Sequence, residues 1–333
     1  MNWDLIGHEW AVELLQEHIR RGRTRHAYLL AGPLSAGRRT LALRFARAIN
    51  CEQPPAPGEV CGSCRACRGI ERMQHPDLSV VQAEPPGGTL KVEQVRELQH
   101  SLSLAPYEAR YRIALLLNFE QAHPSAANAL LKTLEEPPPQ VILLLTAESP
   151  ESLLPTIVSR CETLRLRPSP LEAVAGGLAK RWELEPEQAR LLAHISGGRA
   201  GYALRLSQEP ELLERRRERL DEHSRLLGAS RAERFAYVDP LYKDKAALRE
   251  TLIFWLSLWR DVLIRSAGAS SPLANLDREA EVEALAERAG FEASRRAVAS
   301  LQRTLALLDI NINTRLAFEV LLLDLPALQG FAL

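Results

Sequence analysis

Two glycines and the residues after them have the spacing of a phosphate-binding loop. In the pattern G-x-x-x-x-G-K-[ST], backbone N–H groups face phosphate, the lysine reaches the outer phosphates and the hydroxyl binds Mg²⁺. Gly32 and Gly37 keep the glycine positions. Arg38 and Arg39 occupy the lysine and hydroxyl positions, and Thr40 follows one position late, on a helix face rotated by about 100°. The sequence therefore predicts a degenerate nucleotide loop.

The flanks of this loop favour the same interpretation over a chance pair of glycines. An apolar run precedes the loop at 27–31, and the helix expected at 38–50 carries Leu41, Phe45 and Ala48 on one face. Arginine at a helix N-terminus can still attract phosphate by its charge and by the backbone dipole. Passive anion binding therefore stays open, while ATP binding is expected to be absent or weak.

Four cysteines form a second group that could do chemistry. Cys51, Cys61, Cys64 and Cys67 make a C-x9-C-x2-C-x2-C pattern. Each C-x2-C step is a tight turn that directs two sulfurs at one point, as a tetrahedral Zn²⁺ site requires. Four thiolate ligands leave no position for a reactive water, so the predicted zinc is structural. Prolines and glycines between the cysteines favour a knuckle built from loop.

Two alternatives to the zinc site are a redox thiol cluster and unrelated buried cysteines. The fifth cysteine, Cys161, lies far from the others in the sequence and is expected to be an ordinary buried thiol.

Composition narrows the class of protein. The 333 residues contain 42 basic and 42 acidic side chains, so any contact with DNA should be limited or shared with partners. No run of about 18 apolar residues occurs, which predicts no membrane span. The first ten residues lack the basic and apolar regions of a signal peptide, and a cytoplasmic location is expected.

The first half alternates apolar strands with amphipathic helices, the pattern of a parallel α/β sheet. Strands are predicted at 27–31, 78–82, 112–117, 141–146 and 163–166, and helices near 8–20, 38–50, 91–103, 125–135 and 151–158. After Pro168 and Pro170 strands disappear. Helices are expected near 171–182 and 186–195, after 196–198, and throughout the remainder from about 208, where Trp255, Trp259 and Leu263 form an apolar stripe for a core or helix interface.

Together these segments resemble the delta-prime family of subunits of the bacterial DNA polymerase III clamp loader, AAA+ proteins related to the gamma/tau ATPase subunits. The likeness is carried by the four-cysteine module and by HAYLLAGP (26–33), HPD (75–77), LKVEQVREL (90–98), ANALLKTLEEPP (127–138), SRC (159–161) and NINTRLAFEVLLLDL (311–325). It implies a RecA-like AAA+ domain at 1–166 with the zinc module inserted at 51–67, a three-helix lid at 167–207 and an all-α collar domain for oligomerisation at 208–333.

The resemblance also implies a function. The chain would be a non-catalytic stator subunit that supports loading of the sliding clamp onto primed DNA, as an accessory subunit of a DNA polymerase holoenzyme. Arg160 of SRC would act as an arginine finger in trans, on ATP held by a neighbouring gamma/tau subunit, because a guanidinium can stabilise charge on the transferring phosphoryl oxygens. The implied partners are the gamma/tau and delta subunits and, indirectly, the clamp and primed DNA, with no membrane. For an isolated arginine, a surface salt bridge would be the simpler interpretation.

The other ATPase positions argue against catalysis by the chain itself. Leu117 and Asn118 take the places of the acidic pair that holds Mg²⁺ and polarises water, and Glu120 comes about two residues late. Gly201 aligns with a lid arginine of the active relatives, whereas Thr146 keeps a sensor-like hydroxyl. No intrinsic ATPase is therefore expected.

Two rival functions remain. An active gamma/tau-type ATPase is disfavoured by the three losses at the loop, the acidic pair and the lid. A zinc-knuckle nucleic-acid-binding protein is disfavoured because only Arg65 and Arg68 accompany the cysteines, whereas single-strand binding uses stacking aromatics in a basic groove.

Overall fold

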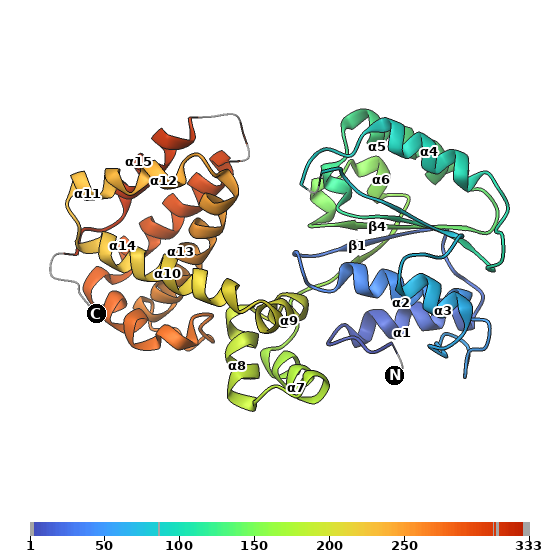
Figure 1. Cartoon of the computed structure of the whole chain (residues 1–333), viewed down its shortest axis with the longest axis horizontal. Coiled ribbons are helices and arrows are strands. Elements are labelled where there is room, and N and C mark those ends of the chain that lie inside the picture. Colours follow the sequence, from blue (N-terminus) through green and yellow to red (C-terminus); the bar gives the residue numbers. More distant parts are fainter. Residues whose placement is uncertain (1–2, 86, 309, 311–312, 329–333) are drawn as a thin grey trace. The chain divides into compact units, whose positions relative to one another are not determined.

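The structure is a computed structural model that describes residues 3–85, 87–308, 310 and 313–328 (Figure 1). It divides into two compact units: residues 1–181 with 198–202, and residues 182–197 with 203–333. Asn311 and Ile312 of the family-like ending, and residues 329–333 of the predicted collar, lie outside the described residues.

The first unit is built on a five-stranded parallel sheet. The strands are β1 (Ala27–Ala31), β2 (Leu78–Val81), β3 (Arg112–Leu116), β4 (Val141–Ala147) and β5 (Glu162–Arg165), in the order β2-β3-β4-β1-β5. Every residue of β1, β3 and β4 is buried, as expected for parallel strands covered on both faces. All five predicted strands are confirmed.

Helices cover both faces of this sheet (Figure 1). On one face lie α1 (Glu9–Arg20), α2 (Arg38–Asn50) and the short α3 (Arg65–Glu71). On the other lie α4 (Val92–Leu102), α5 (Pro124–Glu135) and α6 (Pro155–Val158). Successive side chains of β1 point to opposite faces of the sheet, so the core has two parts. Tyr28 and Leu30 pack with α1 and α2, whereas Leu29 packs with α4 and α5.

Two local predictions for this unit were wrong. The expected helix at 151–158 is two short pieces, η2 (Pro150–Ser152) and α6, because Pro155 forces Leu154 into an extended conformation. The cysteine module is not all loop, because Cys64 caps α3 and Cys67 lies in its first turn.

The HPD segment ties the loop before β3 to the start of β2. The carboxylate of Asp77 accepts backbone N–H groups of Tyr107 at 2.7 Å and of Glu108 and Ala109 at 2.9 Å, and Arg112 at 3.2 Å. Burial alone would raise the pKa of Asp77, but these donors outweigh it and the pKa is lowered. Asp77 is therefore an ionised anchor for residues 107–109.

Helices follow the sheet, beginning with the predicted lid helices α7 (Leu171–Trp182), α8 (Pro186–Ile195) and α9 (Ala200–Gln208). Nearly all of α7 belongs to the first unit, which also contains η1 (Phe119–Gln121). The second unit contains α8, most of α9, α10 (Pro210–Gly228), α11 (Arg231–Ala236), α12 (Val238–Leu241), α13 (Lys245–Ser266), η3 (Leu276–Arg278), α14 (Glu279–Leu308) and α15 (Thr314–Asp324). Trp255 and Trp259 of the predicted apolar stripe on α13 are fully buried, and the third member, Leu263, is half-buried. Within the described part of the chain, no helix has the length and apolar character needed to cross a bilayer.

A buried arginine in the second unit donates hydrogen bonds to the C-terminal ends of two helices. Arg234 is 4% exposed, and its guanidinium donates to five carbonyl oxygens at the ends of α10 and α15, those of Leu226, Leu227, Leu322, Leu325 and Pro326. Carbonyl groups in the last turn of a helix lack the usual N–H partner four residues on, so Arg234 supplies donors at both helix ends.

His223 makes the stability of the second unit depend on pH. Its Nε2 accepts the indole N–H of Trp259 at 2.9 Å, and burial, reinforced by the Arg234 cation, lowers the pKa of His223 to about 3. The unfolded chain takes up this proton near pH 6.5, whereas the folded chain does not until about pH 3. The stabilisation is therefore complete above pH 6.5 and is lost as the pH falls, at up to about 1.4 kcal/mol per pH unit.

Urea unfolding followed by tryptophan fluorescence at several pH values tests this dependence. Compared with the wild type, His223→Gln keeps an acceptor for Trp259 and should show a shallower loss of unfolding free energy with acid. Parallel pH curves for the two proteins would rule out His223 as the responsible group.

Candidate functional site

The glycine loop leads from β1 to α2 as predicted, but its two glycines serve the fold in different ways. The N–H of Gly32 donates to the carbonyl of Ala147 at 3.0 Å, and a Cβ there would lie 2.2 Å from the carbonyl oxygen of Leu166. Gly37 precedes α2 with φ 101°, a conformation that favours glycine. Gly32 is therefore required by close packing at the end of β5, and its N–H does not face the cavity.

An open cavity of about 330 Å³ lies beside this loop. It is lined by the loop, the start of α2, the residues at the carboxyl ends of β2, β3 and β4, and one lid residue: Leu34, Ser35, Gly37, Arg38, Arg39, Thr40, Gln82, Leu117, Asn118, Thr146 and Gly201. The carboxyl edge of a parallel sheet is where such folds bind ligands. The predicted loop residues, apart from Gly32, are thus brought together with both positions of the missing acidic pair.

Arg38, at the lysine position, turns to a protein partner. The side chain is 5% exposed, and its Nη2 donates to Oδ1 of Asn118 at 3.1 Å. Its Nη1 is buried without a hydrogen-bond partner among the residues described. Burial lowers the pKa of Arg38, against the attraction of Glu120 and Glu148. The cation that would meet phosphate in an ATPase is therefore joined to the amide at the acidic-pair position.

The end of β3 is held by the sensor-like hydroxyl. Asn118 has φ 50°, and its backbone N–H donates to Oγ1 of Thr146 at 2.8 Å. Glu120 is half-buried and does not line the cavity, and burial raises its pKa despite Arg38 nearby. Thr146 therefore positions the backbone of Asn118, and no carboxylate lines the cavity among the described residues.

The remaining positions of the site are also altered. Arg39 is exposed, and its Nη2 lies 3.0 Å from Sδ of Met73, a weak acceptor. Gly201 donates its N–H to the carbonyl of Ser35 at 3.1 Å, and a Cβ at Gly201 would lie 2.9 Å from that oxygen. An arginine at position 201 would require this contact to open.

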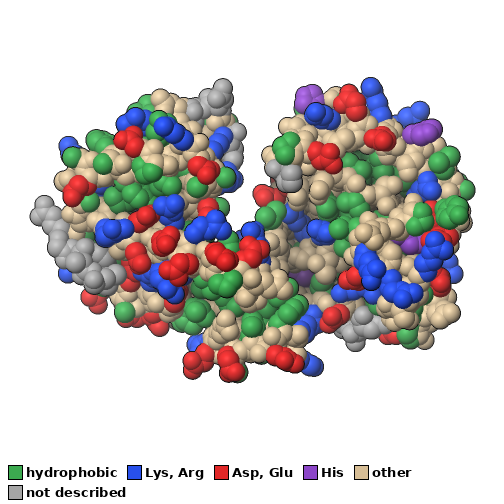
Figure 2. Space-filling model, viewed as in Figure 1, with side chains coloured by type: hydrophobic (Ala, Val, Ile, Leu, Met, Phe, Trp, Pro, Cys, Tyr) green, Lys and Arg blue, Asp and Glu red, His purple; other side chains and the backbone are tan. Residues whose placement is uncertain are grey.

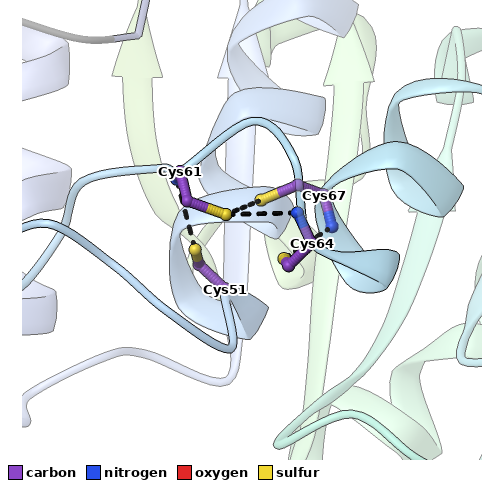
Figure 3. Close-up of side chains that lie close together, drawn as sticks. All are labelled: Cys51, Cys61, Cys64 and Cys67. Carbon is purple, nitrogen blue, oxygen red and sulfur yellow. Dashed lines mark hydrogen bonds between the residues drawn. The ribbon is translucent and has the colours of Figure 1, made fainter.

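The four cysteines converge on one point (Figure 3). Their sulfurs all lie within 4.8 Å of one another, and Sγ of Cys61 and Cys67 are 3.9 Å apart. A tetrahedron with Zn–S distances of about 2.3 Å has sulfurs roughly 3.8 Å apart. An all-sulfur donor set of this size fits a structural zinc ion and leaves no open coordination position.

Backbone N–H groups around the sulfurs favour the thiolate form, whereas burial opposes it at two of the four cysteines. Three backbone N–H groups donate to these sulfurs at 3.3 Å: Cys61 to Sγ of Cys51, Cys64 to Sγ of Cys61, and Cys67 to Sγ of Cys64. The N–H groups of Cys64 and Ser63 lower the pKa of Cys61 to about 6. Burial raises the pKa of Cys51 and, to about 12, that of Cys67. A divalent cation would supply the positive charge that these two thiolates need.

The module contacts the rest of the sheet domain at two places, its middle and its C-terminal part. The carbonyl of Gly58 accepts the indole N–H of the buried Trp3 at 2.8 Å and the side-chain amide of Gln16 at 3.3 Å. On the other side, Arg65 of α3 pairs with Glu108 at 3.0 Å. The cysteine cluster is therefore continuous with the packing of α1 and with the loop anchored by Asp77.

Arg160 lies at the surface, between α6 and β5. Its Nη2 pairs with Glu135 at 2.6 Å, and its Nη1 donates to the carbonyl of Thr156 at 2.9 Å. The side chains of Arg160 and Glu135 are 35% and 50% exposed. Sequence reasoning missed Glu135, although it belongs to the ANALLKTLEEPP segment. The two family-like segments meet through this ion pair.

Arg160 does not line the cavity of its own chain. Cys161, beside it, is half-buried, and burial raises its pKa to about 12, which agrees with an unreactive thiol.

The parallel sheet in the order β2-β3-β4-β1-β5, the glycine loop between β1 and α2, and the helical C-terminal region define a RecA-like fold of the AAA+ class. Residues 7–170 match the family described as DNA polymerase III, delta subunit, and residues 210–326 match its C-terminal family. DNA polymerase III subunit delta' of Bacillus subtilis is 34% identical over 266 residues, which is 79% of each chain. The chain therefore belongs to the delta' family of DNA polymerase III subunits, and the resemblance is confirmed.

The chain is also similar to a second delta' subunit and to a tau subunit of DNA polymerase III. The delta' subunit of Pseudomonas aeruginosa is 38% identical over 202 residues, covering 59% of this chain and 60% of that protein. DNA polymerase III subunit tau of Bacillus subtilis is 31% identical over 208 residues, covering 61% of this chain and 36% of tau.

Proposed function

We propose that this chain is a non-catalytic stator subunit of the DNA polymerase III clamp loader, which supports loading of the sliding clamp onto primed DNA. It assembles with the gamma/tau and delta subunits into a hetero-oligomer. Its domains are the AAA+ domain at 1–166 with a structural zinc at 51–67, the lid at 167–207 and the collar at 208–333. Membership of the delta' family supports the assignment to the clamp loader. The altered nucleotide site supports the non-catalytic role within that complex.

The observation that carries the non-catalytic role is the hydrogen bond between Arg38 and Asn118. In an ATPase the first position binds phosphate and the second binds Mg²⁺ or activates water. Here Nη2 of Arg38 donates to Oδ1 of Asn118, so the two positions contact each other inside the cavity. ATP would have to break this hydrogen bond and would find no carboxylate to complete a Mg²⁺ site.

Arg160 is the group that this subunit contributes to catalysis in a neighbour. Its guanidinium is at the surface and is held mainly by one partly exposed ion pair. Such pairs are typically worth about 0–1 kcal/mol, so a triphosphate with its higher charge can displace Glu135. The alternative, a purely structural salt bridge, predicts no effect of Arg160 on ATP hydrolysis in the assembled complex.

The purified chain is expected to show no ATP turnover. Removing one charge-assisted hydrogen bond from a nucleotide site costs about 1.5–3 kcal/mol, so the substitutions at the loop, the acidic pair and the lid together predict ATP affinity at least about 10³-fold below that of a gamma/tau subunit. Equilibrium binding of MgATP and a phosphate-release assay, with a gamma/tau subunit as the positive control, measure both quantities. Turnover that disappears in Glu120→Ala would identify an active motor subunit instead.

A further inference from the structure

An exposed group of arginines lies on α2 and α3, and we call Arg39, Arg68 and Arg72 the arginine face. Arg39 is in the first turn of α2 and contacts Met73, the neighbour of Arg72, at 3.0 Å. Arg68 and Arg72 are one turn apart on and just after α3. All three are exposed, and Figure 2 shows Lys and Arg side chains gathered where Figure 1 draws α2 and α3.

This face carries a local excess of positive charge in a chain that is neutral overall. Residues 38–75 contain seven arginines, no lysine and three glutamates. Glu71 accepts from Arg44 at 2.7 Å and also pairs with Arg47, while Glu52 accepts the N–H of Ala66 at the start of α3. The three arginines of the face form no ion pair with any residue that the structure describes. Their charge is therefore available to an external anion.

The chemistry of the face fits phosphate groups on a regular polymer. Guanidinium forks match phosphate oxygens in shape and charge. Arg68 and Arg72 are four residues apart, or about 6 Å along a helix axis. Alternate phosphates on one strand of DNA are separated by about 6.8 Å along the duplex axis.

The absence of stacking groups favours duplex over single-stranded DNA. Residues 38–75, all of which are described, contain one phenylalanine, Phe45, and it is 1% exposed. Proteins that bind single strands use exposed aromatic side chains as platforms for the bases. Contacts limited to phosphate should therefore be sequence-independent and sensitive to salt.

We propose that Arg39, Arg68 and Arg72 form a docking surface for the phosphate backbone of duplex DNA. The proposal uses membership of a replication complex to choose DNA over an acidic protein, and it does not depend on Arg160. The cysteine module would then position the arginines of α3, because Cys64 caps this helix and Cys67 lies in its first turn. A zinc ion on these ligands would hold Arg68 and Arg72 in place beside α2.

The test measures binding of a short fluorescein-labelled duplex to the full-length chain by fluorescence anisotropy, between about 50 and about 200 mM salt. The variant carries Arg39→Ala, Arg68→Ala and Arg72→Ala. Three phosphate contacts contribute about 2.7 to the slope of log affinity against log salt, so the slope should fall by about that amount and the affinity at low salt by more than about tenfold. The control carries Arg295→Ala, Arg296→Ala and Arg303→Ala on α14, which removes the same charge from exposed positions, and should bind within about twofold of wild type.

Several results would overturn this proposal. They are an unchanged slope in the first variant, equal losses in both variants, no wild-type binding at low salt, tighter binding of a single strand than of the duplex, or displacement of the duplex by polyglutamate as effectively as by unlabelled DNA. Zinc content and circular dichroism establish that the variants are folded. Arg160→Ala should bind the duplex as wild type does, so failure of the arginine face and failure of the proposed function give different results.

Discussion

A clamp loader reconstituted with Arg160→Ala is expected to assemble normally and to lose ATP hydrolysis at the site that faces this subunit. An arginine finger stabilises charge that develops on the transferring phosphoryl group, and its removal costs about 10³-fold or more in the rate at that site. Single-turnover hydrolysis in the presence of primed DNA measures this rate, and gel filtration measures assembly. The total steady-state rate falls less wherever other sites in the complex still turn over.

Two further variants separate a finger from a general loss of surface charge. Arg165→Ala removes a nearby guanidinium that pairs with Glu151 at 2.6 Å and is 60% exposed, and it should leave the rate unchanged. Arg160→Lys keeps the charge but loses the planar fork, so its rate should lie between those of alanine and wild type. A wild-type rate for Arg160→Ala in an assembled complex would mean that the pair with Glu135 is only structural.

The sheet was predictable because its strands are buried on both faces and therefore appear as short apolar runs. Helix ends that depend on one local contact were harder to predict. The seven residues of α3 are too few for an apolar period, and the helix begins where the Cys64 sulfur accepts the N–H of Cys67. The break before α6 depends on Pro155, which the apolar pattern of the expected helix concealed.

The defects of the nucleotide loop were visible in the sequence, because each is a replaced residue at a fixed position of a motif. The contacts that the substituted residues make instead could not be predicted from the sequence. Arg38 and Asn118 are 80 positions apart, and their contact follows from β3 and β1 both flanking β4. Likewise, Glu135 and Arg160 come from segments before β4 and before β5, so their ion pair depends on the strand order. Motif spacing predicts candidate residues, whereas the sheet decides which of them meet.

Replacing one cysteine of the module is expected to release zinc and to loosen the surrounding structure. In Cys64→Ser the ion would lose one of four ligands, and α3 would lose its capping sulfur. Structural zinc sites contribute folding free energy directly, because the site does not exist in the unfolded chain. If about 2 kcal/mol of this contribution reaches the first unit, its Tm falls by roughly 4–8 °C. Elemental analysis and thermal unfolding measure the two effects, and proteolysis should begin within residues 51–67.

A matched variant and an oxidant distinguish this site from the alternatives. Cys161→Ser removes a thiol outside the cluster and should retain zinc and Tm. A redox thiol cluster would instead contain no zinc as purified, and mild oxidation would remove two hydrogen atoms per disulfide formed, the electrons passing to the added oxidant; mass spectrometry detects this loss of mass. Because Gly58 of the module accepts from Trp3 and Gln16, loss of the metal should also expose Trp3, which is 1% exposed in the folded chain. Loss of zinc with no change in stability would show that the ion is bound but does not support the fold.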